Sequence, residues 1–218
     1  MKLLIKEEEI VAIDAGAGIT LEGALSVPPD AKGVVLFAHG SGSSRLSPRN
    51  NYVAGELRKA GLGTLLMDLL TKEEDADYQT RFNITLLIKR LVSATGWLAD
   101  GERTKKLRIG YFGASTGAAA ALAASVNVKT KIGAIVSRGG RVDLASDYLG
   151  KVKAPTLFIV GGHDDIVIEL NRSSFELLKC EKDIVIVPGA SHLFEEPGTL
   201  EQVSGHAAKW FKKHLEKK

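Results

Sequence analysis

The sequence predicts an α/β protein with a mostly parallel, eight-stranded sheet flanked by helices. Short apolar runs alternate with longer amphipathic segments along most of the chain. Runs such as residues 34–37 are apolar at every position, which is typical of parallel strands buried on both faces. The chain has 218 residues, which is enough to bury a core of its own, so we expect a single domain over residues 1–218.

The expected strands are the apolar runs bounded by turn-forming or charged residues: 10–14, 21–27, 34–38, 63–68, 108–113, 133–137, 156–160 and 183–187. The expected helices are 50–60, 84–99, 116–125, 144–149, 169–178 and 200–216. The first two strands are more polar and follow one another around Gly16 and Gly18, which predicts an antiparallel start. The later alternation implies right-handed crossovers and an active crevice beyond the carboxyl ends of the strands.

Composition and charge exclude several classes of function. Lys and Arg total 29 against 26 Asp and Glu, a net charge of +3 with no dense basic reading motif, so no nucleic-acid partner is expected. The basic segment 209–218 suits the end of a helix. No run of 18 apolar residues predicts a membrane span. Charged residues 6–9 interrupt the N-terminal apolar run, so we expect no signal peptide and a cytoplasmic protein.

Cysteine content bears on disulfides and metals. Cys180 is the only cysteine, which excludes an intramolecular disulfide and any Cys-x-x-Cys site. We therefore expect neither a metal nor a cofactor.

The sharpest motif is the G-x-S-x-G sequence at residues 113–117. It follows an expected strand and opens a helix of very small residues, the context in which such a motif forms a tight turn that exposes its serine. The pattern predicts Ser115 as a nucleophile at a helix N-terminus. The alternative is a glycine-rich turn in which Ser115 only caps the helix.

A serine nucleophile needs a base, and five histidines compete for that role. His192 lies in the loop after the last strand, where a base belongs if the chain order is serine, acid, histidine. We therefore predict His192 as the base, with a buried structural histidine as the alternative. We expect His206 and His214 to be solvated on the last helix. We expect His39 and His163 to shape turns.

The acid that orients the base should follow the strand between these two motifs. The turn after residues 156–160 supplies Asp164 and Asp165. Adjacent carboxylates on a turn point in different directions, so one can face the imidazole while the other caps the next helix. We choose Asp164 and keep Asp165 open.

Backbone N–H groups are expected to form an oxyanion hole. One donor is Thr116, which follows the nucleophile, and the other comes from the glycine-rich turn after residues 34–38. We nominate Ser41, with Gly42 as the fallback. The alternative for this turn is a plain glycine-rich loop.

The combination of four motifs resembles the α/β-hydrolase fold; they lie at residues 39–42, 113–117, 161–164 and 191–192. Within that fold, the chain is most similar to the dienelactone-hydrolase-like family, from about residue 21 to the last helix. The family pattern G-x-x-D-x-x-V fits residues 161–167, which favours Asp164. The chain departs from dienelactone hydrolase itself, which uses a cysteine where this sequence has Ser115.

The resemblance implies a serine hydrolase that cleaves small carboxylic esters or lactones through an acyl-enzyme. Acyl transfer and amide cleavage remain alternatives within the same machinery, as does a non-catalytic homologue that binds a small ligand. Between residues 137 and 155 there is room for only one short helix, so no lid domain is expected and the site should be open. The sequence does not indicate an oligomeric state.

Charged residues near the expected site leave the substrate's charge open. Arg45, Arg138 and Arg141 follow strand ends, where each could clamp a substrate carboxylate or form a structural pair with a residue such as Asp143 or Asp147. Asp68 and the acidic segment 73–77 would repel an anion if they lined the mouth of the site.

Overall fold

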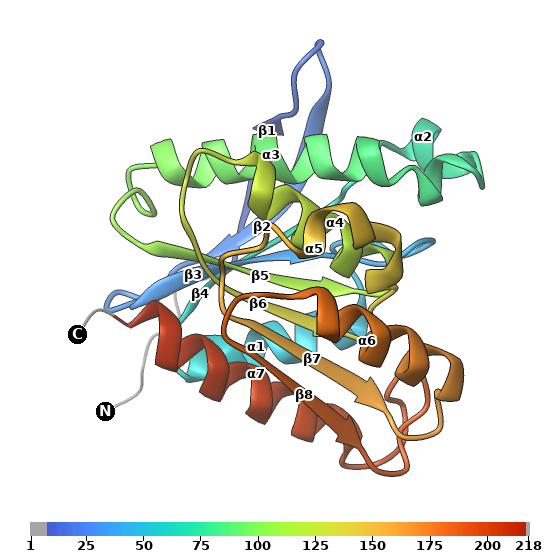
Figure 1. Ribbon diagram of the computed structural model, residues 1–218. Helices are drawn as coiled ribbons and strands as arrows, with labels where there is room; N and C mark the ends of the chain where they lie inside the picture. The colour runs from blue at the N-terminus through green and yellow to red at the C-terminus, as the bar shows by residue number, and fades with distance from the viewer. Residues whose placement is uncertain (1–7, 217–218) are drawn as a thin grey trace.

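One sheet with the strand order β1-β2-β4-β3-β5-β6-β7-β8 organises the computed structural model, which describes residues 8–216 (Figure 1). Its strands are β1 (Glu9–Asp14), β2 (Thr20–Ser26), β3 (Gly33–Ala38), β4 (Gly63–Met67), β5 (Arg108–Ala114), β6 (Ile132–Arg138), β7 (Thr156–Gly161) and β8 (Lys182–Val187). The pairs β1–β2 and β2–β4 are antiparallel and the remaining pairs are parallel. The predicted fold class, with its antiparallel start, is confirmed.

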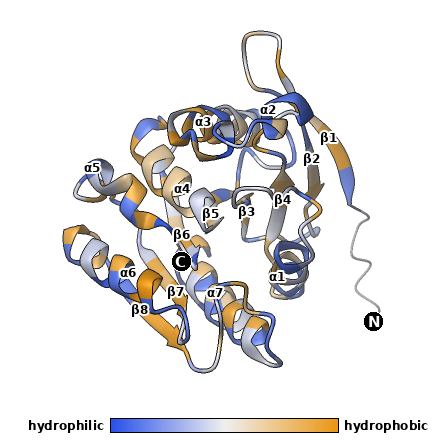
Figure 2. Cartoon of the chain, turned by 90° about the vertical axis from the view of Figure 1, so that its right-hand side faces the viewer, coloured by the Kyte–Doolittle hydropathy of each residue, from blue (hydrophilic) through white to orange (hydrophobic). Residues whose placement is uncertain are grey.

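Helices cover both faces of the sheet. They are α1 (Pro48–Lys59), α2 (Lys72–Ala76), α3 (Ile84–Asp100), α4 (Thr116–Asn127), α5 (Ser146–Leu149), α6 (Asp165–Leu177) and α7 (Thr199–Leu215), with 3-10 turns at Thr80–Phe82 and Val142–Ala145. One core lies between the sheet and α1 with α7, and the other lies against α3 and α4. Figure 2 shows β7 and β8 coloured mostly hydrophobic, whereas α1 and α7 mix polar and apolar residues.

The main departures from the expected helices are at α2 and α6. Helix α2 forms where an acidic loop was expected, because Thr71 and Glu74 form a capping box that satisfies the first N–H groups of a segment with no buried residue. Helix α6 begins at Asp165 instead of residue 169, so the helix starts directly after Asp164. The crossover from β6 to β7 contains only a 3-10 turn and the single turn of α5, as expected for a protein without a lid.

The N-terminal residues 1–7, which bear on the signal-peptide prediction, and residues 217–218 of the basic tail lie outside the described residues. Among residues 8–216, none of the helices is both long and apolar enough to cross a membrane.

Candidate active site

Ser115 lies at a strained turn between β5 and α4. Its backbone has φ 52° and ψ −121°, a conformation that a non-glycine residue rarely adopts and that is typical of functional sites. The Ser115 N–H donates to the carbonyl of Arg138 at 3.2 Å, and the N–H of Arg141 donates to the Ser115 carbonyl at 3.1 Å. The end of β6 and the loop that follows it therefore hold the turn on both sides.

Glycines let the turn approach strand β3. A Cβ atom on Gly117 would collide with the backbone carbonyls of Ala38 and His39. One on Gly40 would lie 3.1 Å from the Ser115 Cβ atom, closer than most real contacts. The first turn of α4 and the loop after β3 can meet beside Ser115 only because these positions lack side chains.

His192 and Asp164 are directly bonded. Nδ1 of His192 donates to Oδ2 of Asp164 at 2.6 Å, with 15% of the aspartate side chain and 38% of the histidine side chain exposed. This bond places the proton on Nδ1, so the lone pair lies on Nε2. Two backbone bonds join the loops that carry the residues: Gly162 N–H to the Val187 carbonyl at 2.8 Å and His163 N–H to the Ala190 carbonyl at 2.9 Å. Of the two candidate acids, Asp164 is the one that contacts the imidazole.

The turn after β6 lies between His192 and Ser115. A Cβ atom on Gly139 would lie 3.4 Å from both Nδ1 and Cε1 of His192, while the preceding carbonyl, of Arg138, binds the Ser115 N–H. The two side chains therefore flank one turn at the carboxyl edge of the sheet. The Ser115 hydroxyl has no hydrogen-bond partner among residues 8–216, so a Ser115–His192 hydrogen bond is not formed in this state.

The two predicted oxyanion donors are neighbours. The backbone N–H of Ser41 donates to Oγ1 of Thr116 at 3.0 Å. Gly42, the fallback donor, has φ +66° and lies next to Arg81. The loop after β3 is thereby tied to the residue that follows the nucleophile.

His39 shapes the turn, as the sequence predicts. Its Nε2 accepts from the N–H of Leu69 at 2.9 Å, and its Nδ1 donates to the carbonyl of Gly40 at 2.9 Å. Burial lowers the pKa of His39 below its ordinary value of 6.5. A neutral imidazole thus joins the ends of β3 and β4.

The prediction for the last helix holds only in part. His206 is exposed, but the His214 side chain is 10% exposed and packs against Trp210 with ring centroids 4.7 Å apart. His214 is therefore not solvated, because the tertiary packing of α7 covers it. Burial lowers its pKa.

Two of the three arginines form structural pairs. Arg141 binds Asp143 with two hydrogen bonds of 3.0 and 2.9 Å. Arg45 binds Asp68 at 3.0 Å and Glu22 at 2.6 Å.

Arg138 contradicts the structural-pair alternative. Its side chain is buried, its Nε and Nη1 atoms have no hydrogen-bond partner within residues 8–216, and its guanidinium lies 5.8 Å from the centre of the Phe194 ring. Burial, together with the charge of Arg49, lowers the pKa of Arg138 to about 10. A buried cation without a carboxylate therefore lies at the carboxyl end of β6, below the His192 loop.

The acidic segment after β4 is paired with arginines. Glu74 lies 2.6 Å from Arg90, and Asp75 lies 3.1 Å from Arg81. The Arg81 guanidinium comes within 3.5 Å of the Cβ position of Gly42, beside the predicted oxyanion loop. Sequence analysis missed Arg81, because no pattern indicates that residues 80–82 fold back toward that loop.

Metal ligation finds no support in the described part of the chain. Residues 8–216 contain no group of three or more His, Cys, Asp or Glu side chains that could hold an ion.

Comparison with known proteins identifies the family and the fold. Residues 21–216 match the model of the dienelactone hydrolase family. A crystal structure of a dienelactone hydrolase from Anabaena variabilis is 53% identical, with a TM-score of 0.93 over 96% of this chain and 99% of that one. A lidless α/β serine hydrolase from Xanthomonas campestris shares the fold at 20% identity, with a TM-score of 0.77 over all of both chains.

Curated relatives carry a different name. Proteins of Mycobacterium tuberculosis named "Putative phosphoribosyl transferase" are 53% identical over 211 residues, which is 97% of this chain but only 47% of theirs. The chain thus spans about half the length of these relatives. Because the family model covers nearly the whole of this chain, the chain belongs to the dienelactone hydrolase family.

Proposed function

We propose that this protein is a serine hydrolase that cleaves small carboxylic esters or lactones through an acyl-enzyme. The observation that carries the proposal is the 2.6 Å hydrogen bond between His192 and Asp164, formed at the same sheet edge as the strained Ser115. Membership of a hydrolase family and structural similarity to esterases, such as Est1E from Butyrivibrio proteoclasticus (TM-score 0.80, 15% identity, 94% of this chain and 98% of that one), agree with it.

In the proposed mechanism, the Ser115 hydroxyl attacks the substrate carbonyl while Nε2 of His192 takes its proton. Asp164 keeps the imidazole in the tautomer that can accept this proton and stabilises the imidazolium that forms. The backbone N–H groups of Thr116 and Ser41 bind the oxyanion, each contributing on the order of 3 kcal/mol to the barrier. His192 then protonates the leaving alcohol, and water releases the acyl group by the reverse sequence.

Ser115 and His192 flank the same turn at 138–139, one on each side. Catalytic hydrogen bonds are often long or unformed without substrate and tighten when it binds. The unformed Ser115–His192 bond is therefore compatible with the proposal.

The relatives named phosphoribosyl transferases are about twice as long as the segment that matches this chain. This chain carries the hydrolase motifs and matches the dienelactone hydrolase family over residues 21–216, so we propose hydrolysis for it. Acyl transfer to another alcohol or thiol would use the same residues and differ only in the second nucleophile.

The test is hydrolysis of p-nitrophenyl acetate and p-nitrophenyl octanoate by wild type, Ser115→Ala and Ser173→Ala. Ser173 is exposed on α6 and serves as the matched serine control. We expect wild type and Ser173→Ala to hydrolyse the acetate and Ser115→Ala to fall to background. Equal rates for all three proteins, or no turnover of either ester, would refute a serine esterase and favour the ligand-binding alternative.

A further inference from the structure

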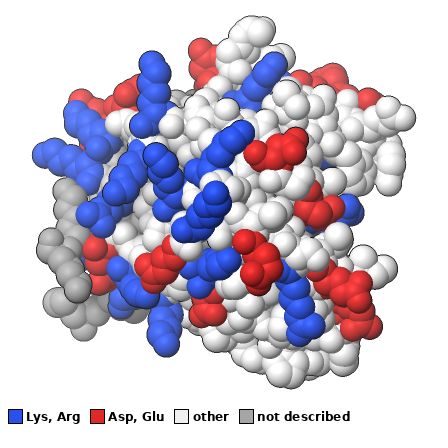
Figure 3. Space-filling model, viewed as in Figure 1, with Lys and Arg blue, Asp and Glu red and all other residues white. Residues whose placement is uncertain are grey.

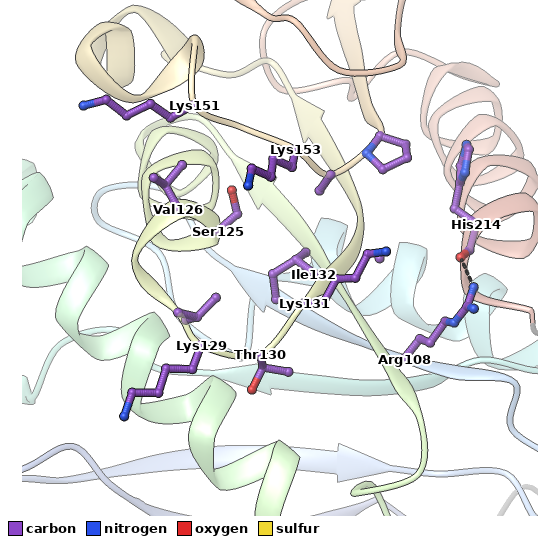
Figure 4. Close-up of a pocket in the computed structure, with 14 residues that line it drawn as sticks. Arg108, Ser125, Val126, Lys129, Thr130, Lys131, Ile132, Lys151, Lys153 and His214 are labelled. Carbon is purple, nitrogen blue, oxygen red and sulfur yellow. Dashed lines mark hydrogen bonds between the residues drawn. The ribbon is translucent and has the colours of Figure 1, made fainter.

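A wide cavity lies at the edge of the sheet opposite Ser115. It has a volume of about 990 Å³ and is lined at the first residues of β5 and β6, the loop after α4, the segment before β7, and His214 of α7 (Figure 4). Strand β5 has seven residues, so this cavity lies about 20 Å from Ser115 at a rise of ~3.3 Å per residue. The proposed hydrolase site therefore does not use it.

The charge of the cavity lining is positive. Of the residues that line the cavity, five are basic and none is Asp or Glu: Arg108, Lys129, Lys131, Lys151 and Lys153. The net charge of the chain is only +3, so the rest of the molecule is net acidic. Figure 3 shows many Lys and Arg side chains on the left of the molecule. The amino ends of β5–β8 lie on the same side in Figure 1, which has the same view.

These cations have no acidic partner among the described residues. None of the four lysine side chains forms an ion pair or a hydrogen bond with another residue of 8–216, although the Lys151 ammonium lies 5.9 Å from the centre of the Tyr148 ring. Arg108 donates to the backbone carbonyl of His214 at 3.3 Å. The neighbouring acid, Glu181, is bound by Lys213 at 2.6 Å. The cavity therefore presents uncompensated positive charge.

An anion in the cavity is close to several cations at once. A sphere with the volume of the cavity has a radius of about 6 Å, so an anion at its centre lies within about one Debye length, about 8 Å at physiological salt, of the lining. The cations of the lining therefore attract such an anion together. In Figure 4, Lys131 and Lys153 lie between the other labelled residues, whereas Lys129 and Lys151 point outward from them.

Charge and lining define the class of ligand. A phosphoryl group carries up to two negative charges and accepts hydrogen bonds from several lysines, so two or more such groups match five cations where one carboxylate does not. Between the cations the lining is apolar or hydroxyl-bearing, with Val126, Ile132 and Pro155 beside Ser125 and Thr130. An organic group can pack on the apolar residues while the phosphoryl groups face the lysines.

We propose that this cavity is a binding site for small ligands that carry two or more phosphoryl groups. The site is independent of the proposed hydrolase activity and lies at the opposite edge of the sheet.

The test is calorimetric titration of the full chain with pyrophosphate, with adenosine diphosphate and with inorganic phosphate. We expect the first two to bind at least tenfold more tightly than inorganic phosphate, and their affinity to fall as salt rises from about 0.05 to about 0.3 M. Lys131→Ala/Lys153→Ala should weaken both by at least tenfold, and Lys131→Arg/Lys153→Arg should retain them.

The matched control is Lys89→Ala/Lys209→Ala, which removes two exposed lysines from α3 and α7 outside the cavity. It should leave binding unchanged, and all variants should hydrolyse esters as wild type does. The proposal is overturned if pyrophosphate and phosphate bind alike or if the control pair weakens binding equally. It is also overturned if neither diphosphate binds but a single-stranded oligonucleotide does.

Discussion

The backbone N–H of Ser41 donates a 3.0 Å hydrogen bond to Oγ1 of Thr116, 75 positions later in the chain. This bond joins the loop after β3 to the first turn of α4, beside Ser115. The sequence predicts both residues as oxyanion donors through their backbone N–H groups. In the resting state the Thr116 hydroxyl accepts from the Ser41 N–H and so positions the loop after β3 beside Ser115.

Thr116→Val keeps the side-chain shape and removes the acceptor that positions the loop. We expect kcat/KM for p-nitrophenyl acetate to fall about tenfold, equivalent to about 1.4 kcal/mol of barrier. Thr116→Ser retains the hydroxyl and should stay close to wild type. A valine variant as active as wild type would show that the hydroxyl does not position Ser41.

Asp164→Asn should lower kcat by about 10³-fold or more, because an amide no longer holds the His192 tautomer or stabilises its charged form. Asp165→Asn provides the matched control, since Asp165 is exposed in the first turn of α6. Steady-state ester hydrolysis measures both. Comparable losses in the two variants would contradict the assignment of Asp164 as the orienting acid.

Gly117→Ala places a methyl group against the backbone carbonyls of Ala38 and His39, which cannot move aside as a flexible side chain can. We expect it to lower the free energy of unfolding by about 3 kcal/mol, as overpacking does. Gly96→Ala, within α3, meets no atom within 4 Å and should raise the same quantity by about 0.5–1 kcal/mol through helix propensity. Urea unfolding measures both, and a shift of the same sign at the two positions would refute the steric argument.

Acid should destabilise the fold through His39. Because burial depresses its folded-state pKa below 6.5, the unfolded chain binds a proton first as pH falls. The stabilisation is complete above pH 6.5 and is lost as pH drops toward the folded-state pKa, where protonation also breaks the bond from the Leu69 N–H.

The measurement is the difference in unfolding free energy between about pH 7.5 and about pH 5.5. His39→Gln should reduce this difference, while His206→Gln, at an exposed position, should leave it unchanged. His214, whose pKa is also lowered by burial, contributes in the same direction in both variants. An unaltered difference in His39→Gln would rule out His39 as the source.

Local patterns in the sequence predict most of the fold and the order of the proposed site residues along the chain. Fully apolar runs such as residues 34–37 can bury only as central strands, and the G-x-S-x-G motif forms one kind of strand-to-helix turn. Helix α2 has no apolar periodicity, so its start was readable only from the spacing of Thr71 and Glu74. Placing β4 between β2 and β3 depends on long-range pairing that no local pattern encodes.

By itself, the sequence determined the fold class and predicted a tight turn at Ser115, with His192 as base and Asp164 favoured over Asp165, because backbone sterics and motif spacing act over a few residues. Only the tertiary structure decided which charges meet. It paired Arg141 with Asp143, left Arg138 buried without an acid, and gathered Lys131 and Lys153 around a cavity far from Ser115. Electrostatic partners depend on distances across the folded chain, and those distances exist only after the sheet has brought remote segments together.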